Sequence, residues 1–168
     1  ANACTGAQGE SDALEMTRTV AAALKLPQQT VQICSTGVIG QTLPIDKIRG
    51  GIDLAVRSLS PHHASDFAQA IRTTDLYQKA VRRTFEYDGS SYTVQGIAKG
   101  AGMIAPNMAT MLAFVFTDAP IDQNTLSQIW HRVCDVTFNA MTVDGDTSTN
   151  DTALVLSSGA DRDPLDSS

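Results

Sequence analysis

Apolar residues near the start of the chain recur with the period of an α-helix, and Pro27 stops the pattern. A helix with one apolar face packs that face against a neighbour. Ser11 and Asp12 are residues that can cap a helix, and Glu15 stands three residues after Asp12, as in a capping box. The pattern therefore predicts a packing helix that begins near Asp12, with Ala13, Met16, Val20 and Leu24 along one face.

Three later segments show the same helical period. Residues 45–59 carry an apolar stripe, although Gly50 and Gly51 weaken the middle of this helix, and residues 62–71 form a shorter helical segment. Asp122 is a capping residue placed before a third stripe, which runs from Leu126 to Ala140. We expect helices in all three segments.

Other segments have the patterns of β-strands. Residues 30–34 alternate between polar and apolar side chains, and residues 80–87 and 92–98 flank the hairpin sequence Asp88-Gly89. The run 111–116 is wholly apolar, which is typical of a buried strand, and residues 153–156 are a second apolar run. Together with the helices, these segments predict a mixed α/β (α+β) fold in which strands pack between helices.

Composition narrows the class of protein. The chain of 168 residues is 42% hydrophobic, enough for one compact domain, and its net charge of −6 argues against nucleic acid or an anionic membrane as a partner. No apolar run is long enough to span a bilayer. Cys4, Cys34 and Cys134 lack the spacing of metal ligands. They are typical of reduced thiols, so we expect a cytoplasmic protein without a bound metal.

The segment from Lys99 to Phe116 joins a glycine-containing half to the apolar strand. Gly100 and Gly102 impose little steric limit on the backbone, and Thr110 lies where the strand begins. One interpretation is a loop that enters a core strand. The other is that the Thr110 hydroxyl is a nucleophile, first toward its own backbone and then toward a substrate. Spacing alone leaves both interpretations open.

The sequence of residues 99–110 closely resembles the self-cleavage segment of the ornithine acetyltransferase family. It is Lys-Gly-Ala-Gly-Met-Ile-Ala-Pro-Asn-Met-Ala-Thr. Members of this family are the bifunctional glutamate N-acetyltransferases of arginine biosynthesis. Further segments match the family in the same order over nearly the whole chain. The resemblance implies self-cleavage between Ala109 and Thr110, after which the new N-terminal threonine carries the acetyl group.

The resemblance also implies how the chain is organised. Family members are more than twice as long, so residues 1–168 are expected to be one central fragment. Residues 1–109 would end an α chain and residues 110–168 would begin a β chain, in a heterotetramer. The implied fold is a layered helix–sheet–sheet–helix architecture, similar to that of N-terminal-nucleophile enzymes. The implied partners are N2-acetylornithine and glutamate, with no nucleic acid, membrane, metal or cofactor, while acetyl-CoA stays open as a second donor.

The segment Ser35-Thr36-Gly37 follows the predicted strand at residues 30–34. A glycine there can turn its N–H toward a ligand, but the sequence alone favours a plain strand-to-turn junction. In the ornithine acetyltransferase family the Thr-Gly of this segment forms the oxyanion hole. The resemblance therefore implies that role for the Thr36 side chain and the Gly37 N–H. Acyl transfer needs such donors because negative charge develops on one oxygen.

Two further segments are implied to bind the substrate. Thr73-Thr74-Asp75 by itself indicates a strand end or a turn, and in the family a threonine of this segment contacts the substrate. We assign Thr74, with Thr73 as the close alternative. A lysine after a strand, such as Lys99, is usually solvated. The resemblance instead places Lys99 on the substrate, together with Thr110, where its cation would pair with a carboxylate.

An acidic stretch runs from Thr142 to Asp151, and its carboxylates at Asp144 and Asp146 are reminiscent of a calcium loop. A calcium loop is disfavoured because its glycine and its closing glutamate are missing. A phosphoryl-transfer motif would follow a strand, whereas this stretch follows a predicted helix. The ornithine acetyltransferase family carries nearly the same text, so we expect the stretch to line or brace the site, without a catalytic role for a named residue.

These patterns and the resemblance together predict an autoproteolytically activated acetyltransferase. It would move the acetyl group from N2-acetylornithine to L-glutamate through an acetyl-threonine at Thr110, in a ping-pong mechanism. Two other classes remain. One is another N-terminal-threonine enzyme, such as an amidohydrolase or aminopeptidase, and the other is a non-catalytic binding fragment.

Overall fold

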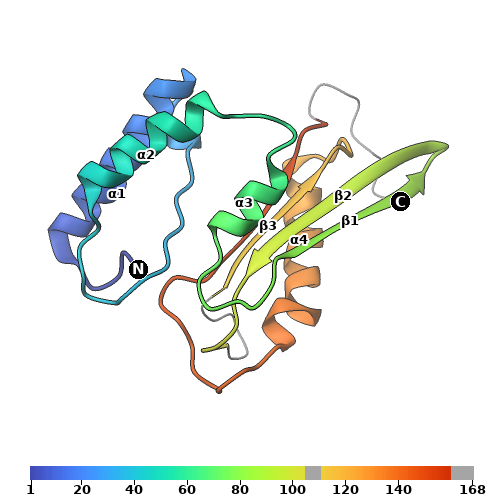
Figure 1. Cartoon of the computed structure of the whole chain (residues 1–168). Helices are drawn as coiled ribbons and strands as arrows, with labels where there is room; N and C mark the ends of the chain where they lie inside the picture. The colour runs from blue at the N-terminus through green and yellow to red at the C-terminus, as the bar shows by residue number, and fades with distance from the viewer. Residues whose placement is uncertain (105–110, 160–168) are drawn as a thin grey trace. The chain divides into compact units, whose positions relative to one another are not determined.

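The computed structural model describes residues 1–104 and 111–159 of the chain. The chain divides into two compact units, Ala1–Ala64 and Ser65–Ser168. Figure 1 follows their helices and strands in chain order, from blue to red. The predicted cleavage site, Ala109 and Thr110, lies outside the described residues.

The first unit is helical. α1 (Gly6–Leu24) packs against α2 (Ile45–Arg57), and the two helices lie side by side in Figure 1. The Arg49 guanidinium on α2 pairs with the Glu15 carboxylate on α1 at 3.2 Å. A short 3-10 helix, η1 (Gln28–Thr30), follows α1. Helix α2 confirms the helix predicted for residues 45–59.

The prediction that the first helix begins near Asp12 is wrong, because α1 begins at Gly6. Asn2 organises the first turn. Its Oδ1 accepts from Thr5 Oγ1 at 2.7 Å, and its Nδ2 donates to the Gly9 carbonyl at 2.8 Å. These bonds tie the Asn2 side chain to the first turn of α1, although neither of them satisfies one of the free N–H groups at the helix start. Asp12 therefore lies inside the helix, with only 3% of its surface exposed.

The predicted strand at residues 30–34 is also wrong. Residues 28–30 form η1, and residues 31–34 are irregular. A strand needs a neighbour to complete its backbone hydrogen bonds, and the described residues of the first unit include no strand. The Gln28 side chain instead holds this segment against α1, through a hydrogen bond of 2.9 Å from its Nε2 to Thr17 Oγ1.

The second unit is built on one sheet of four strands in the order β1-β2-β3-β4. β1 (Lys79–Tyr87) and β2 (Ser90–Lys99) form the predicted hairpin, with positive φ angles of 47° at Asp88 and 70° at Gly89, as a tight two-residue turn requires. β3 (Leu112–Thr117) runs antiparallel to β2, and β4 (Thr152–Ser157) runs parallel to β3. The predicted apolar strands are thus confirmed as the two neighbours β3 and β4.

Helices cover both faces of this sheet, as Figure 1 shows for α3 and α4. α3 (Ala64–Ala70) packs Phe67 edge-on against Phe114 of β3, with ring centroids 5.2 Å apart. α4 (Gln123–Val136) lies on the other face, where Trp130 Nε1 donates to the Ala153 carbonyl at 3.2 Å. The 3-10 helix η2 (Phe138–Ala140) follows α4.

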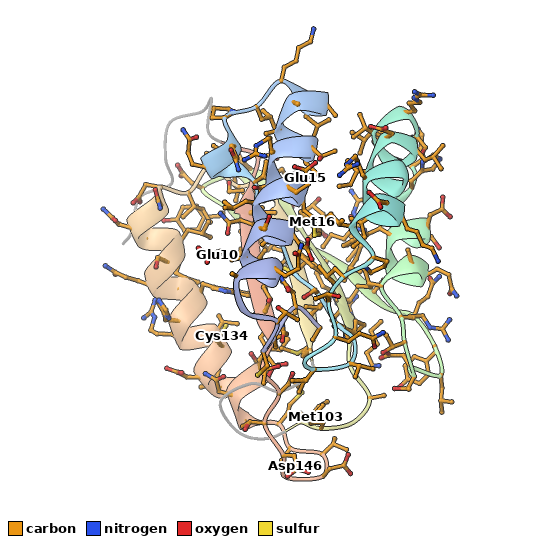
Figure 2. The ribbon with its side chains drawn as sticks, turned by 90° about the vertical axis from the view of Figure 1, so that its left-hand side faces the viewer. Glu10, Glu15, Met16, Met103, Cys134 and Asp146 are labelled. Atoms are coloured by element: carbon orange, nitrogen blue, oxygen red, sulfur yellow. The ribbon has the colours of Figure 1, made fainter. Side chains whose placement is uncertain are left out.

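The start of α4 confirms the predicted cap. Asp122 accepts hydrogen bonds from the backbone N–H groups of Asn124 and Thr125. A side-chain hydrogen bond from Thr125, followed by these backbone bonds, holds the pKa of the Asp122 carboxyl below its ordinary value. Cys134 is buried near the C-terminal end of α4, where Figure 2 labels it. Burial raises the pKa of its thiol.

The predicted mixed α/β class is confirmed, with antiparallel and parallel strand pairs in one sheet. Among the helices of residues 1–104 and 111–159, none combines the length and apolar character needed to cross a membrane. The candidate functional site lies at one end of the sheet, where β2 ends and β3 and β4 begin. We call it the Lys99 end, because Lys99 is the last residue of β2 and pairs in register with Leu112 of β3.

Candidate active site

Lys99 is the centre of the candidate site. Only 1% of its surface is exposed, and it is the largest fully buried side chain in the part of the chain that the structure describes. Burial lowers the pKa of its ammonium group, and the carboxylates of Asp75 and Asp151 oppose that effect. A buried lysine is rare unless it is paired, so this side chain differs from the solvated lysine that is usual at a strand end.

Asp75 approaches Lys99 from the segment before β1. Only 4% of its surface is exposed. Its Oδ1 accepts from the Gly100 N–H at 2.9 Å and also from Lys79 Nζ, which in turn donates to the Gly100 carbonyl at 3.0 Å. Burial alone would raise the pKa of Asp75, but the Lys79 ammonium and the N–H groups of Gly100 and Thr73 bring it below its ordinary value. Asp75 is therefore a carboxylate held ionised beside the lysine.

Asp151 approaches Lys99 from the other side, just before β4. Its Oδ1 accepts from the Met111 N–H at 2.7 Å. This contact follows from the parallel pairing of β3 and β4, in which Leu112 stands opposite Thr152. Burial raises the pKa of the Asp151 carboxyl, and the Met111 N–H, the Lys99 ammonium and the Ser148 hydroxyl act against that rise.

Sequence reasoning did not single out Asp75 or Asp151. Signals for both were present, because Asp75 follows the two candidate threonines and Asp151 closes the acidic stretch that was expected to brace the site. Their partners are distant along the chain, 25 positions away for Asp75 and Gly100 and 40 for Asp151 and Met111. Local patterns cannot reveal such contacts.

Thr73 and Thr74 both lie in the connection that leads to Asp75, and both are exposed. The Thr73 N–H helps to lower the pKa of the Asp75 carboxyl, so this connection contributes to the electrostatics of the Lys99 end of the sheet. The assignment of substrate binding to Thr74, with Thr73 as the alternative, stays a prediction.

Thr36 and Gly37 belong to the first unit, in an irregular segment where both are exposed. The start of the chain runs beside them. Ala1 N donates to the Val38 carbonyl at 3.2 Å, and a Cβ added to Gly37 would stand 2.4 Å from Ala1 N. This close approach of two backbones requires glycine at position 37. The oxyanion-hole role of Thr36 and Gly37 stays a prediction.

The acidic stretch braces a neighbouring segment. Asp144 Oδ2 accepts from the Met103 N–H at 3.0 Å, and the Ile104 N–H donates to the Val143 carbonyl at 2.7 Å. Figure 2 shows Met103 and Asp146 at the same end of the second unit. Residues 1–104 and 111–159 contain no group of three or more His, Cys, Asp or Glu side chains that could hold a metal ion.

The second unit thus contains a buried ionic site at one end of a mixed sheet. Comparison with known proteins gives the family. The ArgJ family model matches residues 1–168, and the chain belongs to the ArgJ family. This finding agrees with the resemblance that residues 99–110 carry.

Individual relatives support the same assignment. The chain is 52% identical, over 98% of its length, to the arginine biosynthesis bifunctional protein ArgJ of Geobacter sulfurreducens. It is 48% identical, again over 98%, to the protein of that name in Listeria monocytogenes. The chain spans 42% and 41% of the lengths of these two curated relatives.

A solved structure supports the fold. The crystal structure of the arginine biosynthesis bifunctional protein ArgJ from Bacillus halodurans matches with a TM-score of 0.56 and 40% sequence identity. The match covers 65% of this chain and 56% of the solved chain. The mixed α/β architecture is therefore that of an ArgJ protein.

Proposed function

We propose that this chain carries part of the active site of a glutamate N-acetyltransferase that moves an acetyl group from N2-acetylornithine to L-glutamate. Membership in the ArgJ family supports the proposal, as do relatives whose names place them in arginine biosynthesis. The observation that carries it is the position of Lys99. This buried cation pairs in register with Leu112, two residues after the proposed nucleophile Thr110.

In the first half-reaction, the Thr110 hydroxyl attacks the acetyl carbonyl of N2-acetylornithine. The α-amine of Thr110 takes the hydroxyl proton and passes it to the leaving nitrogen as the amide C–N bond breaks. Ornithine leaves, and the acetyl group stays on Thr110 as an ester. In the second half-reaction the amine of glutamate attacks this ester, and N-acetylglutamate leaves as the threonine hydroxyl regains a proton.

The free α-amine requires prior cleavage of the chain. We propose that the Thr110 hydroxyl attacks the Ala109 carbonyl, so that an ester replaces the peptide bond and water then hydrolyses it. The products are an α chain that ends at Ala109 and a β chain that begins at Thr110, which assemble as a heterotetramer in the cytoplasm. Acetyl-CoA would serve as a second acetyl donor, without a bound cofactor or metal.

Four residues of this chain are assigned roles toward the substrates of the proposed reaction. N2-acetylornithine and glutamate both carry an α-carboxylate, and one cation at Lys99 would serve both halves of the cycle. Thr74 would add a hydroxyl contact to the substrate. Thr36 and Gly37 would donate hydrogen bonds to the oxygen that becomes negative in each tetrahedral intermediate.

The test is a kinetic assay of the complete, cleaved protein. Acetyl transfer from N2-acetylornithine to glutamate should show ping-pong kinetics, and acetylated Thr110 should be detected by mass spectrometry when only the donor is present. An assay with amide and peptide substrates runs in parallel. Hydrolysis of those substrates without acetyl transfer would replace the proposal by an N-terminal-threonine hydrolase.

The oxyanion hole is tested by Thr36→Ala. Removal of one such donor typically costs about 2.7–4 kcal/mol, or roughly 10²–10³ in kcat. The KM for N2-acetylornithine should change little, because the donor acts mainly on the transition state. Thr36→Ser should recover much of the rate, and Thr30→Ala, at an exposed threonine of η1, is the control. A raised KM with an unchanged kcat would remove Thr36 from this role.

The pH dependence of kcat/KM should be bell-shaped. Activity should rise as the Thr110 α-amine loses its proton, which an ordinary α-amine does at pH ~7.7–8.0. Activity should fall as Lys99 loses its proton, at a pH below the ordinary lysine value of about 10.4, because burial lowers the pKa of Lys99. Lys99→Arg keeps a cation that does not titrate in this range. An alkaline limb that is the same in Lys99→Arg would contradict the assignment.

A further inference from the structure

Asp75 and Asp151 have matching positions around Lys99. Each accepts a hydrogen bond from the backbone N–H that directly follows a predicted site residue. Asp75 binds the N–H of Gly100, next to Lys99, and Asp151 binds the N–H of Met111, next in sequence to Thr110. Both carboxylates also interact electrostatically with the Lys99 ammonium.

The positive charges of Lys79 and Lys99 balance the negative charges of Asp75 and Asp151. Lys79 pairs with Asp75 and also donates to the Gly100 carbonyl, so both backbone polar groups of Gly100 are held. Gly100 has a φ of 146°, a conformation that favours glycine. Two lysines and two aspartates therefore meet at the Lys99 end of the sheet, which makes burial of their charges tolerable.

Each carboxylate keeps one further oxygen. The Oδ2 atoms of Asp75 and Asp151 are buried and have no hydrogen-bond partner among residues 1–104 and 111–159. The backbone contacts are made by the Oδ1 atoms alone. Such charge-assisted bonds to backbone N–H groups are short and strong, which suits them to fixing a backbone position.

We propose that Asp75 and Asp151 form a carboxylate clamp, a pair of positioning residues that holds the backbone at Gly100 and Met111 and retains the Lys99 cation between them. The clamp thereby keeps the end of β2 and the start of β3 in a fixed relation. Ten residues of the sequence lie between Gly100 and Met111. The effect of the clamp on acetyl transfer rests on the proposed function, whereas its effect on the backbone does not.

The backbone half of the clamp is tested by amide hydrogen exchange in the complete protein, measured at single residues by mass spectrometry. Asp151→Ala should raise exchange at the Met111 amide roughly 10- to 100-fold, because the amide loses a charged acceptor. Asp75→Ala should do the same at Gly100.

Asp118→Ala is the matched control. Asp118 Oδ1 accepts from the Thr93 N–H at the same distance, 2.7 Å, but at the opposite end of the sheet, where the side chain is exposed. This variant should raise exchange at Thr93 and leave Met111 unchanged. An unchanged Met111 amide in Asp151→Ala would overturn the clamp.

The electrostatic half is tested by Asp151→Asn, which keeps an oxygen acceptor for Met111 and removes the charge that faces Lys99. Met111 should stay largely protected from exchange. The alkaline limb of kcat/KM should move to lower pH, because Asp75 alone then opposes the effect of burial on Lys99, and Asp75 is shared with Lys79. An unmoved limb would overturn the role of Asp151 toward Lys99.

The two tests separate the clamp from the proposed function. If the unaltered protein transfers no acetyl group, the proposed function fails, and amide exchange at Met111 and Gly100 still decides whether the clamp exists. If acetyl transfer is present and the Asp151→Ala and Asp75→Ala proteins keep both normal exchange and normal kinetics, the clamp fails and the proposed function stands.

Discussion

Thr110→Ala is expected to leave the complete protein as one uncleaved chain without acetyl-transfer activity. The hydroxyl that would attack the Ala109 carbonyl is absent, so neither the new N-terminus nor the acetyl ester can form. On a denaturing gel the unaltered protein should give two bands, and N-terminal sequencing of the β chain should begin at Thr110. The variant should give one band at the full mass.

Two companion variants make this test specific. Thr110→Ser keeps a hydroxyl and should still cleave, while Thr84→Ala changes an exposed threonine of β1 and should behave as the unaltered protein. A cut at another bond, or cleavage of Thr110→Ala, would show that Thr110 is not the nucleophile.

Lys99→Met is expected to lower kcat/KM for both N2-acetylornithine and glutamate. The methionine keeps much of the apolar stem and removes the charge. Loss of one partner of a buried, hydrogen-bonded charge pair often costs about 2–5 kcal/mol, or roughly 30- to 5,000-fold in kcat/KM. The assay must use protein already confirmed as two chains, because Lys99 could also serve the cleavage step.

The clamp makes stability a second consequence of this change. Without Lys99, Asp75 and Asp151 would lose the cation that both face, so the melting temperature should fall. Lys99→Arg keeps the charge and should retain more stability than Lys99→Met. Lys47→Met, at an exposed lysine of α2, is the matched control and should change neither property. Full activity toward both substrates in cleaved Lys99→Met would show that the lysine does not bind substrate.

Short-range patterns predicted much of the fold. The Asp88-Gly89 hairpin was predictable because two residues with positive φ set the turn, and the start of α4 because Asp122 caps its own helix. The apolar run at 111–116 correctly indicated a strand, whose first residues are buried and whose Phe116 is exposed. These features depend on neighbours within a few residues, which is the information that a sequence pattern contains.

Two predictions failed where contacts outside the local pattern matter. Helix α1 begins at Gly6, ahead of the capping sequence at Asp12, and the Asn2 side chain bonds to Thr5 and Gly9 around its first turn. The alternation at residues 30–34 is that of a strand, but a strand cannot form without a partner to receive its hydrogen bonds. In both segments the local signal alone did not decide the outcome.

The sequence by itself determined the family to which this chain belongs, because residues 99–110 carry a specific text, and it determined which residues are candidates for chemistry. The tertiary structure decided the environment of Lys99. Antiparallel pairing of β2 with β3, and parallel pairing of β3 with β4, bring Asp151 to Met111 across 40 positions of sequence. The burial and pairing of a charge depend on such long-range contacts, since the cost of burying an ammonium group is set by the groups that surround it in space.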